Sequence, residues 1–564
     1  MKALSAVMFL LVLCSFLSGA PLRNVSTEII QPDGSVISCF MTGDEYYHRL
    51  HDSNGFTIVQ NSQTGWFVFA EKSGADLIPG SQIVGRSDPQ SLGLASGLMP
   101  DKSLIEQKVK ALRGENMSTF GRAPTIGAIN NLCIFIRFSD QSEFADQLSY
   151  YDGIYNSTTA ASMKGYFLEE SGNQLSVETT FYPNQPGGFV LSFADAFPRA
   201  YYQPQSLTNP IGYPPGPYVD PDMYGYQRLH TLFTNAVAHI APMVPPGLNI
   251  DADNNGSVDN ISFICRGTAD GTGILWPHYW VLDAYPSTPL VYIHGKQADD
   301  YNFEPQQPDP VYGGGVDTAV VCHEFSHTLG FPDLYHYSFD GLDPCGYWDL
   351  QDWCYQIPQH HLAYQKWKYG GWFTAVPALP ASGTCTLDAV AYNPFDCYMY
   401  QLPTGEQIWL EYRRSVGLYE SRVPGSGLLI YRVDQSLYPW GNAGGPPDEI
   451  YVYRPFVNPG NPNGNLFWAH YAWEQSHTAM NQFTDPAPFS QSFPGFIGGL
   501  NIHSVGSNLG QSITFEVGTQ VPVIWTGAMD NYWFNGANWT TGIVPTATDL
   551  AIVAQGAWTC TITP

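Results

Sequence analysis

Two histidines and a glutamate near the middle of the chain have the spacing of a metal-dependent catalytic site. His323 and His327 stand four residues apart, with Glu324 directly after the first histidine. In a helix, residues four apart share one face, so both imidazoles reach one ion while Glu324 projects beside them. The pattern predicts a zinc site with a general base next to it. The alternative is a helix with two surface histidines.

A catalytic zinc site needs three protein ligands and one open position. Residues 325–405 contain no glutamate, which excludes a third ligand of the kind that some zinc hydrolases take from a later helix. Asp333 follows His323 by ten residues and lies just past Gly330, where a glycine lets the chain turn back toward the ion. The predicted zinc ligands are His323, His327 and Asp333, and the weaker alternatives are His336 and Asp349.

This ligand set predicts a hydrolase. Zinc lowers the pKa of a water molecule toward about 7 and polarises a peptide carbonyl. Glu324 is expected to take a proton from that water and return it to the departing amine, a role worth roughly a hundred- to ten-thousand-fold in rate. Candidate hydrogen-bond donors to the transition state are Tyr335, Tyr347 and Tyr355. His278 and the pair His360 and His361, on a helix expected from Pro358, are interpreted as structural.

A second cluster of oxygen-bearing side chains surrounds Gly256. Side chains that alternate around a glycine in this way wrap a hard cation, and calcium is the natural candidate. The candidate calcium ligands are Asp251, Asp253, Asn255, Ser257 and Asp259. Ser262 stands where a calcium-binding EF-hand has a bidentate glutamate, so the loop departs from that pattern. The alternative is an ordinary surface turn rich in Asp and Asn.

The elements that must position these groups can be read from the hydrophobic pattern. Residues 318–321 support a buried helix that carries the two histidines, and Pro332 prevents it from continuing. Upstream, 132–138 and 174–181 are predicted strands and 162–167 a predicted helix, which indicates an α/β layer structure. After Trp372 the helical pattern nearly vanishes, and alternating runs at 407–411 and 427–431 predict a β-sandwich-like domain.

Composition and the N-terminus define the class of protein. The chain has 564 residues, 23 Lys+Arg against 50 Asp+Glu and a net charge of −27, which argues against a nucleic-acid partner. Met1 and Lys2 precede an apolar run ending in the small residues 18–20, so we predict a cleaved signal peptide and an exported protein. That run is too short for a membrane span. The expected localisation is therefore extracellular or at the cell surface.

Ten cysteines are present, of which Cys14 belongs to the predicted signal peptide. The pairs Cys345/Cys354 and Cys385/Cys397 are candidates for local disulfide bridges. Cys133, Cys265 and Cys322 lie within apolar runs and are expected to be small buried side chains.

Several stretches resemble the secreted immune inhibitor A-like zinc metallopeptidases. They are HEFSHTLGFPDLY at 323–335, GYWDL at 346–350, PQHHLAYQKWKYGGW at 358–372, GLLIYRVD at 427–434, ILWPH at 274–278 and the upstream QPDG and GDE. The resemblance covers most of residues 30–517. It implies an α+β multidomain precursor with an inhibitory N-terminal pro-region, a metzincin-like α/β catalytic domain and a C-terminal β-domain. The family commonly has Met after Trp-Asp-Leu as a floor beneath the metal, whereas this chain has Gln351.

The expected organisation follows from these observations. It comprises a signal peptide (1–20), a pro-region (21–124), a catalytic domain (125–372), a β-sandwich-like domain (373–520) and the start of a Trp-rich β segment (521–564). Cleavage of the pro-region is expected between Arg113 and Pro124, and Cys39 or Asp44 is a candidate contact to the metal before that cleavage.

Three functions are compatible with the sequence. The first is a secreted zinc endopeptidase, made as a zymogen, that acts on proteins or peptides. The second is a catalytically inactive, protease-like adhesin or binding protein at the cell surface, suggested by Gln351 and by a Trp-rich C-terminal region that could mediate surface association. The third keeps zinc but cleaves a non-peptide amide or ester, because ligands alone do not determine the substrate. The intact Glu324 favours an enzyme.

Overall fold

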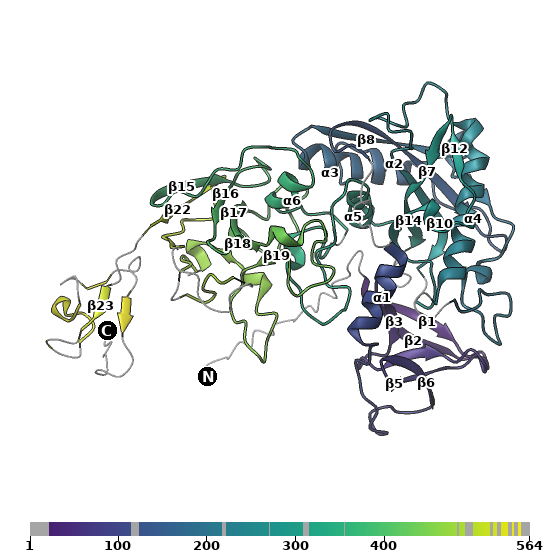
Figure 1. The fold of residues 1–564 in the computed structure, drawn as a ribbon, viewed down its shortest axis with the longest axis horizontal. Coiled ribbons are helices and arrows are strands. Elements are labelled where there is room, and N and C mark those ends of the chain that lie inside the picture. The colour runs from purple at the N-terminus through teal and green to yellow at the C-terminus, as the bar shows by residue number, and fades with distance from the viewer. Residues whose placement is uncertain are drawn as a thin grey trace, which may run out of the picture.

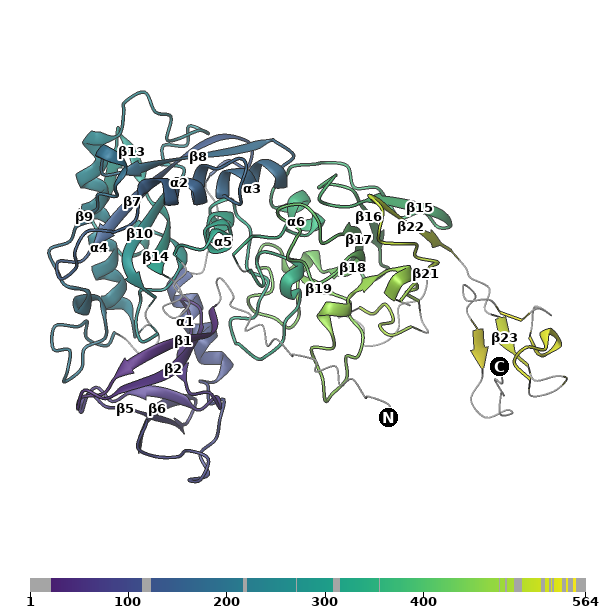
Figure 2. The same cartoon turned by 180° about the vertical axis from the view of Figure 1, so that it is seen from behind.

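The protein is a multidomain α+β chain with several sheets and, among the described residues, six α-helices (Figures 1 and 2). This computed structural model describes residues 22–113, 123–216, 221–269, 271–307, 315–354, 356–475, 477–481, 484–490, 500–518, 523–526, 529, 532–539, 544–545 and 551–553. The predicted signal peptide, most of the predicted cleavage segment and Tyr355 lie outside these ranges.

The N-terminal unit is an antiparallel sheet in which each strand pairs with the next along the chain. Its strands are β1 (Leu22–Ile30), β2 (Val36–Gly43), β3 (His48–His51), β4 (Thr57–Gln60), β5 (Phe67–Ser73) and β6 (Asp76–Ile83). Helix α1 (Lys102–Arg113) follows, although the sequence had indicated only strands and turns here. Ile105 and Val109 stand four residues apart on one helical face and pack into the core of the next unit, which explains the helix.

The central unit is built around a six-stranded sheet with the order β11-β14-β10-β7-β8, and β9 pairs with β7. These strands are β7 (Gly127–Arg137), β8 (Leu175–Tyr182), β9 (Phe193–Ala194), β10 (Ile261–Thr268), β11 (His278–Val281) and β14 (Asp300–Gln307). Strand β11 alone runs antiparallel to its neighbour. The strands predicted at 132–138 and 174–181 are therefore confirmed as β7 and β8.

Helices cover both faces of this sheet. Side chains of β7 alternate between two hydrophobic cores: Leu132 and Ile134 join one, and Cys133 and Phe135 join the other. Helix α4 (Met223–Ile240) closes the first core, and α2 (Leu148–Asn156), α3 (Met163–Glu170) and α5 (Thr318–Thr328) close the second. The small hairpin β12 (Val291–Ile293) and β13 (Lys296–Ala298) lies beside α4. The α/β layers and the helix predicted near 162–167 are confirmed.

Two antiparallel sheets follow the short helix α6 (Ala363–Lys368). One has the order β15-β22-β21, and the other β16-β17-β18-β19 with β20 also paired to β18. The strands are β15 (Gly383–Asp388), β16 (Cys397–Gln401), β17 (Gln407–Arg413), β18 (Gly427–Val433), β19 (Ile450–Val452), β20 (His470–Tyr471), β21 (Ile502–His503) and β22 (Ser512–Val517). Both sheets contribute to one hydrophobic core, for example through Leu387 and Ile430. The parallel pair β23 (Val523–Trp525) and β24 (Ala551–Val553) lies separately (Figure 1).

The predicted local disulfides are wrong. Eight cysteines fall within the described residues, and every one is free and buried. Cys345 and Cys354 belong to different hydrophobic cores, as do Cys385 and Cys397, so proximity in sequence does not bring the paired sulfurs together. The expected burial of Cys133, Cys265 and Cys322 is confirmed.

Within the described part of the chain, none of the helices combines the length and the apolar character that crossing a bilayer demands.

Candidate metal centre

Helix α5 carries the predicted metal ligands in the interior of the protein. Asp317 caps its N-terminus, where the carboxylate accepts a hydrogen bond from the Ala319 backbone N–H at 2.8 Å. All eleven residues of the helix are buried, including His323, Glu324 and His327. The helix ends before Gly330, whose φ of +95° turns the chain back as predicted.

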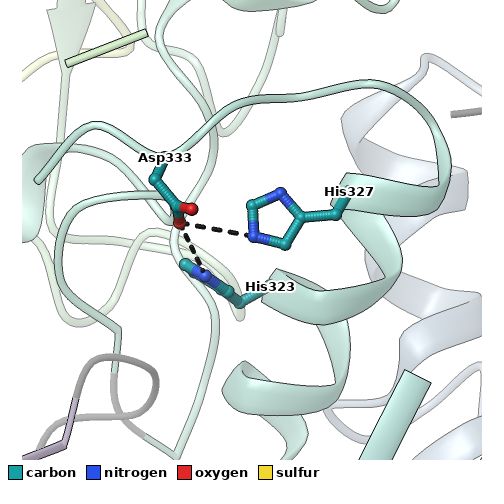
Figure 3. Close-up of side chains that lie close together, drawn as sticks. All are labelled: His323, His327 and Asp333. Carbon is teal, nitrogen blue, oxygen red and sulfur yellow. Dashed lines mark ion pairs between the residues drawn. The ribbon is translucent and has the colours of Figure 1, made fainter. Parts of the chain in front are cut away.

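His323, His327 and Asp333 converge on one point (Figure 3). Each offers one ligand atom, and these atoms lie within 4.8 Å of one another. The Oδ1 atom of Asp333 lies 3.1 Å from Nε2 of His323 and 3.3 Å from Nε2 of His327. All three residues are buried. The predicted triad therefore forms a buried group that could hold a metal ion. We refer to His323, His327 and Asp333 together as the metal group.

Both imidazole rings are oriented by backbone carbonyls. Nδ1 of His323 lies 3.0 Å from the carbonyl oxygen of Leu350, and Nδ1 of His327 lies 2.7 Å from that of Phe331. A carbonyl oxygen only accepts hydrogen bonds, so each Nδ1 carries the proton. The lone pair of a neutral ring is then on Nε2, which is the atom that faces Asp333. This arrangement prepares both rings to bind a cation.

Asp333 is held by groups that the sequence did not indicate. The hydroxyl of Tyr337 donates to its Oδ2 at 2.5 Å, which leaves Oδ1 toward the histidines. The backbone of Gly441 approaches so closely that a Cβ atom there would lie 2.3 Å from the Asp333 carbonyl oxygen. Burial raises the pKa of the Asp333 carboxyl, but charge and hydrogen bonds from His327 and His323 outweigh it and hold that pKa well below its usual range.

Gln351 occupies the position where the resembled family has methionine. Its side chain is fully buried, and its Nε2 lies 3.3 Å from Nδ1 of His327. The backbone carbonyl of Gln351 accepts a hydrogen bond from the Leu334 backbone N–H at 2.9 Å. The glutamine therefore packs against the metal group from the side of the His327 ring. Asp349, proposed as a weak alternative ligand, instead accepts the backbone N–H of Gln351 at 2.8 Å and shapes this turn.

Glu324, the predicted general base, is 2% exposed and follows His323 directly on α5. Its backbone carbonyl accepts a hydrogen bond from Asn302 of β14 at 2.9 Å, which ties the helix to the sheet at this point. The role of Glu324 as general base stays a prediction.

Asp44, in the N-terminal unit, is affected by the charge of Asp333. This side chain is buried, and its Oδ1 accepts the backbone N–H groups of Tyr46 and Tyr47 at 2.8 and 2.7 Å. Burial raises the pKa of Asp44 to about 7, and the nearby charge of Asp333 contributes to the increase. Of the two candidates for contact before cleavage, Asp44 lies near the group, whereas Cys39 is in the core of the N-terminal sheet.

Other predicted residues lie elsewhere. His336 is not in the metal group, because its ring is held between Asp340 at 3.0 Å and Asp448 at 2.7 Å. His278, interpreted as structural, is buried and contacts the Trp276 carbonyl and the Tyr301 hydroxyl. Tyr347 packs edge-on against Trp353 with 5.2 Å between ring centroids.

The pair His360 and His361 precedes a helix instead of lying on one. Helix α6 begins at Ala363, so the helix expected from Pro358 is wrong in its start. The backbone N–H of His360 donates to Glu420 at 3.2 Å, and that of His361 donates to Glu170 at 3.0 Å. These two carboxylates satisfy backbone donors ahead of the helix, which agrees with a structural interpretation of the two histidines.

The loop around Gly256 brings three carboxylates together. Asp251, Asp253 and Asp259 place oxygens within 4.8 Å of one another, and Gly256 has the positive φ of +94° that the turn requires. Lys296 provides a positive charge here, with Nζ 2.5 Å from Oδ2 of Asp251. The loop also closes on itself: Asn255 accepts the Ser257 backbone N–H at 2.8 Å. Ser262 lies in β10 and bonds Asn131 instead of reaching the loop.

Comparison with known proteins adds no assignment. No model of a protein family and no curated protein sequence matches the chain.

Proposed function

We propose that this chain is an exported zinc endopeptidase, made as a latent precursor. The observation that carries the proposal is the convergence of His323, His327 and Asp333 with both Nε2 atoms toward one carboxylate oxygen. We interpret the central unit as a metzincin-like α/β catalytic domain and the two sheets after α6 as a β-sandwich-like domain. Calcium at the Gly256 loop belongs to the same proposal as a structural ion.

The donor set and its spacing fit zinc. Two ligands on tetrahedral zinc with bonds of about 2.0–2.1 Å are separated by about 3.3 Å. The distances from Asp333 Oδ1 to the two imidazole Nε2 atoms are 3.1 and 3.3 Å. Two imidazoles and one carboxylate are ligands that zinc accepts in catalytic sites. When bound, zinc would supply Lewis-acid chemistry to a water molecule and to a carbonyl group.

The residues of the chain divide the remaining work. His323, His327 and Asp333 would hold the ion, and the carbonyls of Leu350 and Phe331 keep the rings in the required tautomer. The carboxylate of Glu324 would accept a proton from the attacking water and donate it to the amine that leaves, because it lies next to His323 in a buried position. Burial strengthens each of these electrostatic effects.

Latency is supported by the position of Asp44. This carboxylate of the N-terminal unit lies close enough to Asp333 for the two charges to raise its pKa. Two buried carboxylates near each other repel unless a cation lies between them. We therefore propose that Asp44 faces the ion in the intact chain and that removal of the N-terminal unit opens the site to substrate.

The test is casein cleavage by protein processed at a specific protease site placed within 114–122. We expect cleavage by the processed wild type, little by the intact chain, and a loss of at least a hundredfold in Glu324→Gln. Glu178→Gln is the matched control, since that side chain is 52% exposed on β8. Equal rates in wild type and Glu324→Gln would exclude Glu324 as base. Absence of cleavage by processed wild type would support the alternative of a binding protein, and cleavage restricted to small amides or esters would support the third hypothesis.

A further inference from the structure

A cationic side chain of the N-terminal unit is held by an aspartate and a tryptophan of the central unit. Nη1 of Arg23, on β1, lies 2.9 Å from Oδ1 of Asp343. The guanidinium carbon lies 4.1 Å from the ring centroid of Trp353, a cation–π contact. The indole N–H of Trp353 donates to the same Asp343 oxygen at 3.2 Å, which orients the side chains of Asp343 and Trp353. The Arg23 and Asp343 side chains are 20% and 18% exposed, so the pair is largely shielded from water.

A second carboxylate lies beside this pair. Asp352 is fully buried, and its Oδ2 accepts the backbone N–H groups of Cys345 and Gly346 at 2.7 and 2.5 Å. Its Oδ1 has no hydrogen-bond partner among the described residues. Burial and the charge of Asp343 raise the pKa of Asp352 to about 8, although the guanidinium of Arg23 acts in the opposite direction. A buried carboxyl oxygen without a partner is costly, so this place favours an occupant that donates hydrogen bonds.

Asp343, Asp352 and Trp353 flank the segment that orients one of the proposed metal ligands. Trp353 stands three residues after Leu350, whose carbonyl orients the His323 ring, so their Cα atoms are at most about 11 Å apart. The pairing of strands in the N-terminal sheet brings Arg23 and Asp44 to one end of that sheet. In the β1–β2 pairing Leu22 is opposite Gly43, so Arg23 and Asp44 come from the same end of the ribbon. One end of the N-terminal sheet thus carries both Asp44, whose pKa is raised by the charge of Asp333, and Arg23, which pairs with Asp343.

We propose that Asp343, Asp352 and Trp353 form a subsite for an arginine side chain of a peptide substrate, which Arg23 fills until the N-terminal unit is removed. This inference rests on the proposed endopeptidase function. Arginine is favoured over lysine because a planar guanidinium stacks on an indole ring and donates in two directions at once. The net charge of −27 would in addition attract basic peptides toward the protein.

The competing explanation is that Asp343, Asp352 and Trp353 only anchor the N-terminal unit. In that case their loss would weaken the hold on this unit without affecting the choice of peptide. The two explanations therefore differ in processed protein, from which Arg23 is absent.

The experiment compares peptides that are identical except for arginine, citrulline, lysine or alanine at one position, scanned along the peptide. Citrulline keeps the shape of arginine and removes its charge. With processed wild type, we expect at one position a kcat/KM for arginine roughly tenfold above that for citrulline. Asp343→Asn should abolish this ratio. The matched control is Asp152→Asn, an exposed aspartate on α2.

Binding is measured separately, by fluorescence polarisation of the labelled arginine and citrulline peptides on processed Glu324→Gln protein. Tighter binding of arginine that depends on Asp343 supports the subsite even if no processed protein cleaves casein, which would reject the proposed function alone. Cleavage of casein with equal use and equal binding of arginine and citrulline at every position would overturn the subsite and leave the endopeptidase proposal intact. The wild-type comparison alone decides the matter if Asp343→Asn fails to fold.

Discussion

Tyr337→Phe tests whether the carboxylate of Asp333 needs a second partner to bind metal. The substitution removes only the hydroxyl that donates to Oδ2 of Asp333 at 2.5 Å, and both residues are buried. A hydrogen bond to a buried charged group contributes about 1.5–3 kcal/mol. Each 1.4 kcal/mol corresponds to a factor of ten in affinity. If the whole free energy of the lost hydrogen bond appeared in zinc binding, the affinity for zinc would fall about ten- to a hundredfold.

The cost divides between two states of the protein. Asp333 is charged in the zinc-free protein as well, because its pKa lies well below the usual range, so part of the loss appears there as lower stability. We therefore expect zinc binding to weaken about tenfold, at the lower end of the range typical of residues that orient metal ligands. The Tm of the zinc-free protein should fall as well.

The assay is a competition titration against a chromophoric zinc chelator, together with thermal unfolding in the absence of metal. Tyr292→Phe is the matched control, because this tyrosine of β12 is 50% exposed and far in sequence from the metal group. A zinc affinity of Tyr337→Phe within twofold of wild type, with an unchanged Tm, would refute the reasoning.

Three further predictions concern the surroundings of the metal group and the acidic loop. The pKa of His336 is raised to about 9, because hydrogen bonds and charge from Asp340 and Asp448 outweigh the effect of burial. The charged ring therefore stabilises the fold fully below about pH 6.5, and this contribution disappears as the pH rises through about 9. His336→Gln should therefore lower Tm at pH 6 and have little effect at pH 10. Gly441→Ala should lower Tm and zinc affinity, because the new Cβ would lie 2.3 Å from the Asp333 carbonyl oxygen, whereas Gly444→Ala, with open space, should do neither. Removal of calcium with EGTA should lower Tm in wild type but not in Asp259→Asn; equal shifts in the two would place calcium elsewhere.

The local parts of the metal group could be predicted from the sequence. The spacing of His323 and His327, the turn at Gly330 and the return to Asp333 all depend on helix geometry over ten residues. Strands β7, β8, β17 and β18 were equally readable, because their apolar runs are long and bounded by turns. Helix α4 was missed even though its buried Tyr226, Leu229, Phe233 and Val237 follow helical spacing, a signal that was present in the sequence.

What the sequence could not indicate are contacts between distant segments. Tyr337 is one aromatic residue among many near the ligands, and only the structure shows that its hydroxyl meets Asp333. Asp44 and Arg23 lie nearly three hundred residues or more before their partners, and no periodicity relates such positions. The predicted disulfides were wrong for the same reason, since chain proximity does not place two cysteines in one core.

The most direct test of the central claim is the zinc content of purified protein, measured by elemental mass spectrometry after exhaustive dialysis. We expect about one zinc per chain in wild type and in His239→Ala, which removes an exposed histidine of α4, and far less in His327→Ala and Asp333→Ala. Zinc retained in full by both of the latter variants, or absent from a folded wild type supplied with zinc, would contradict the account.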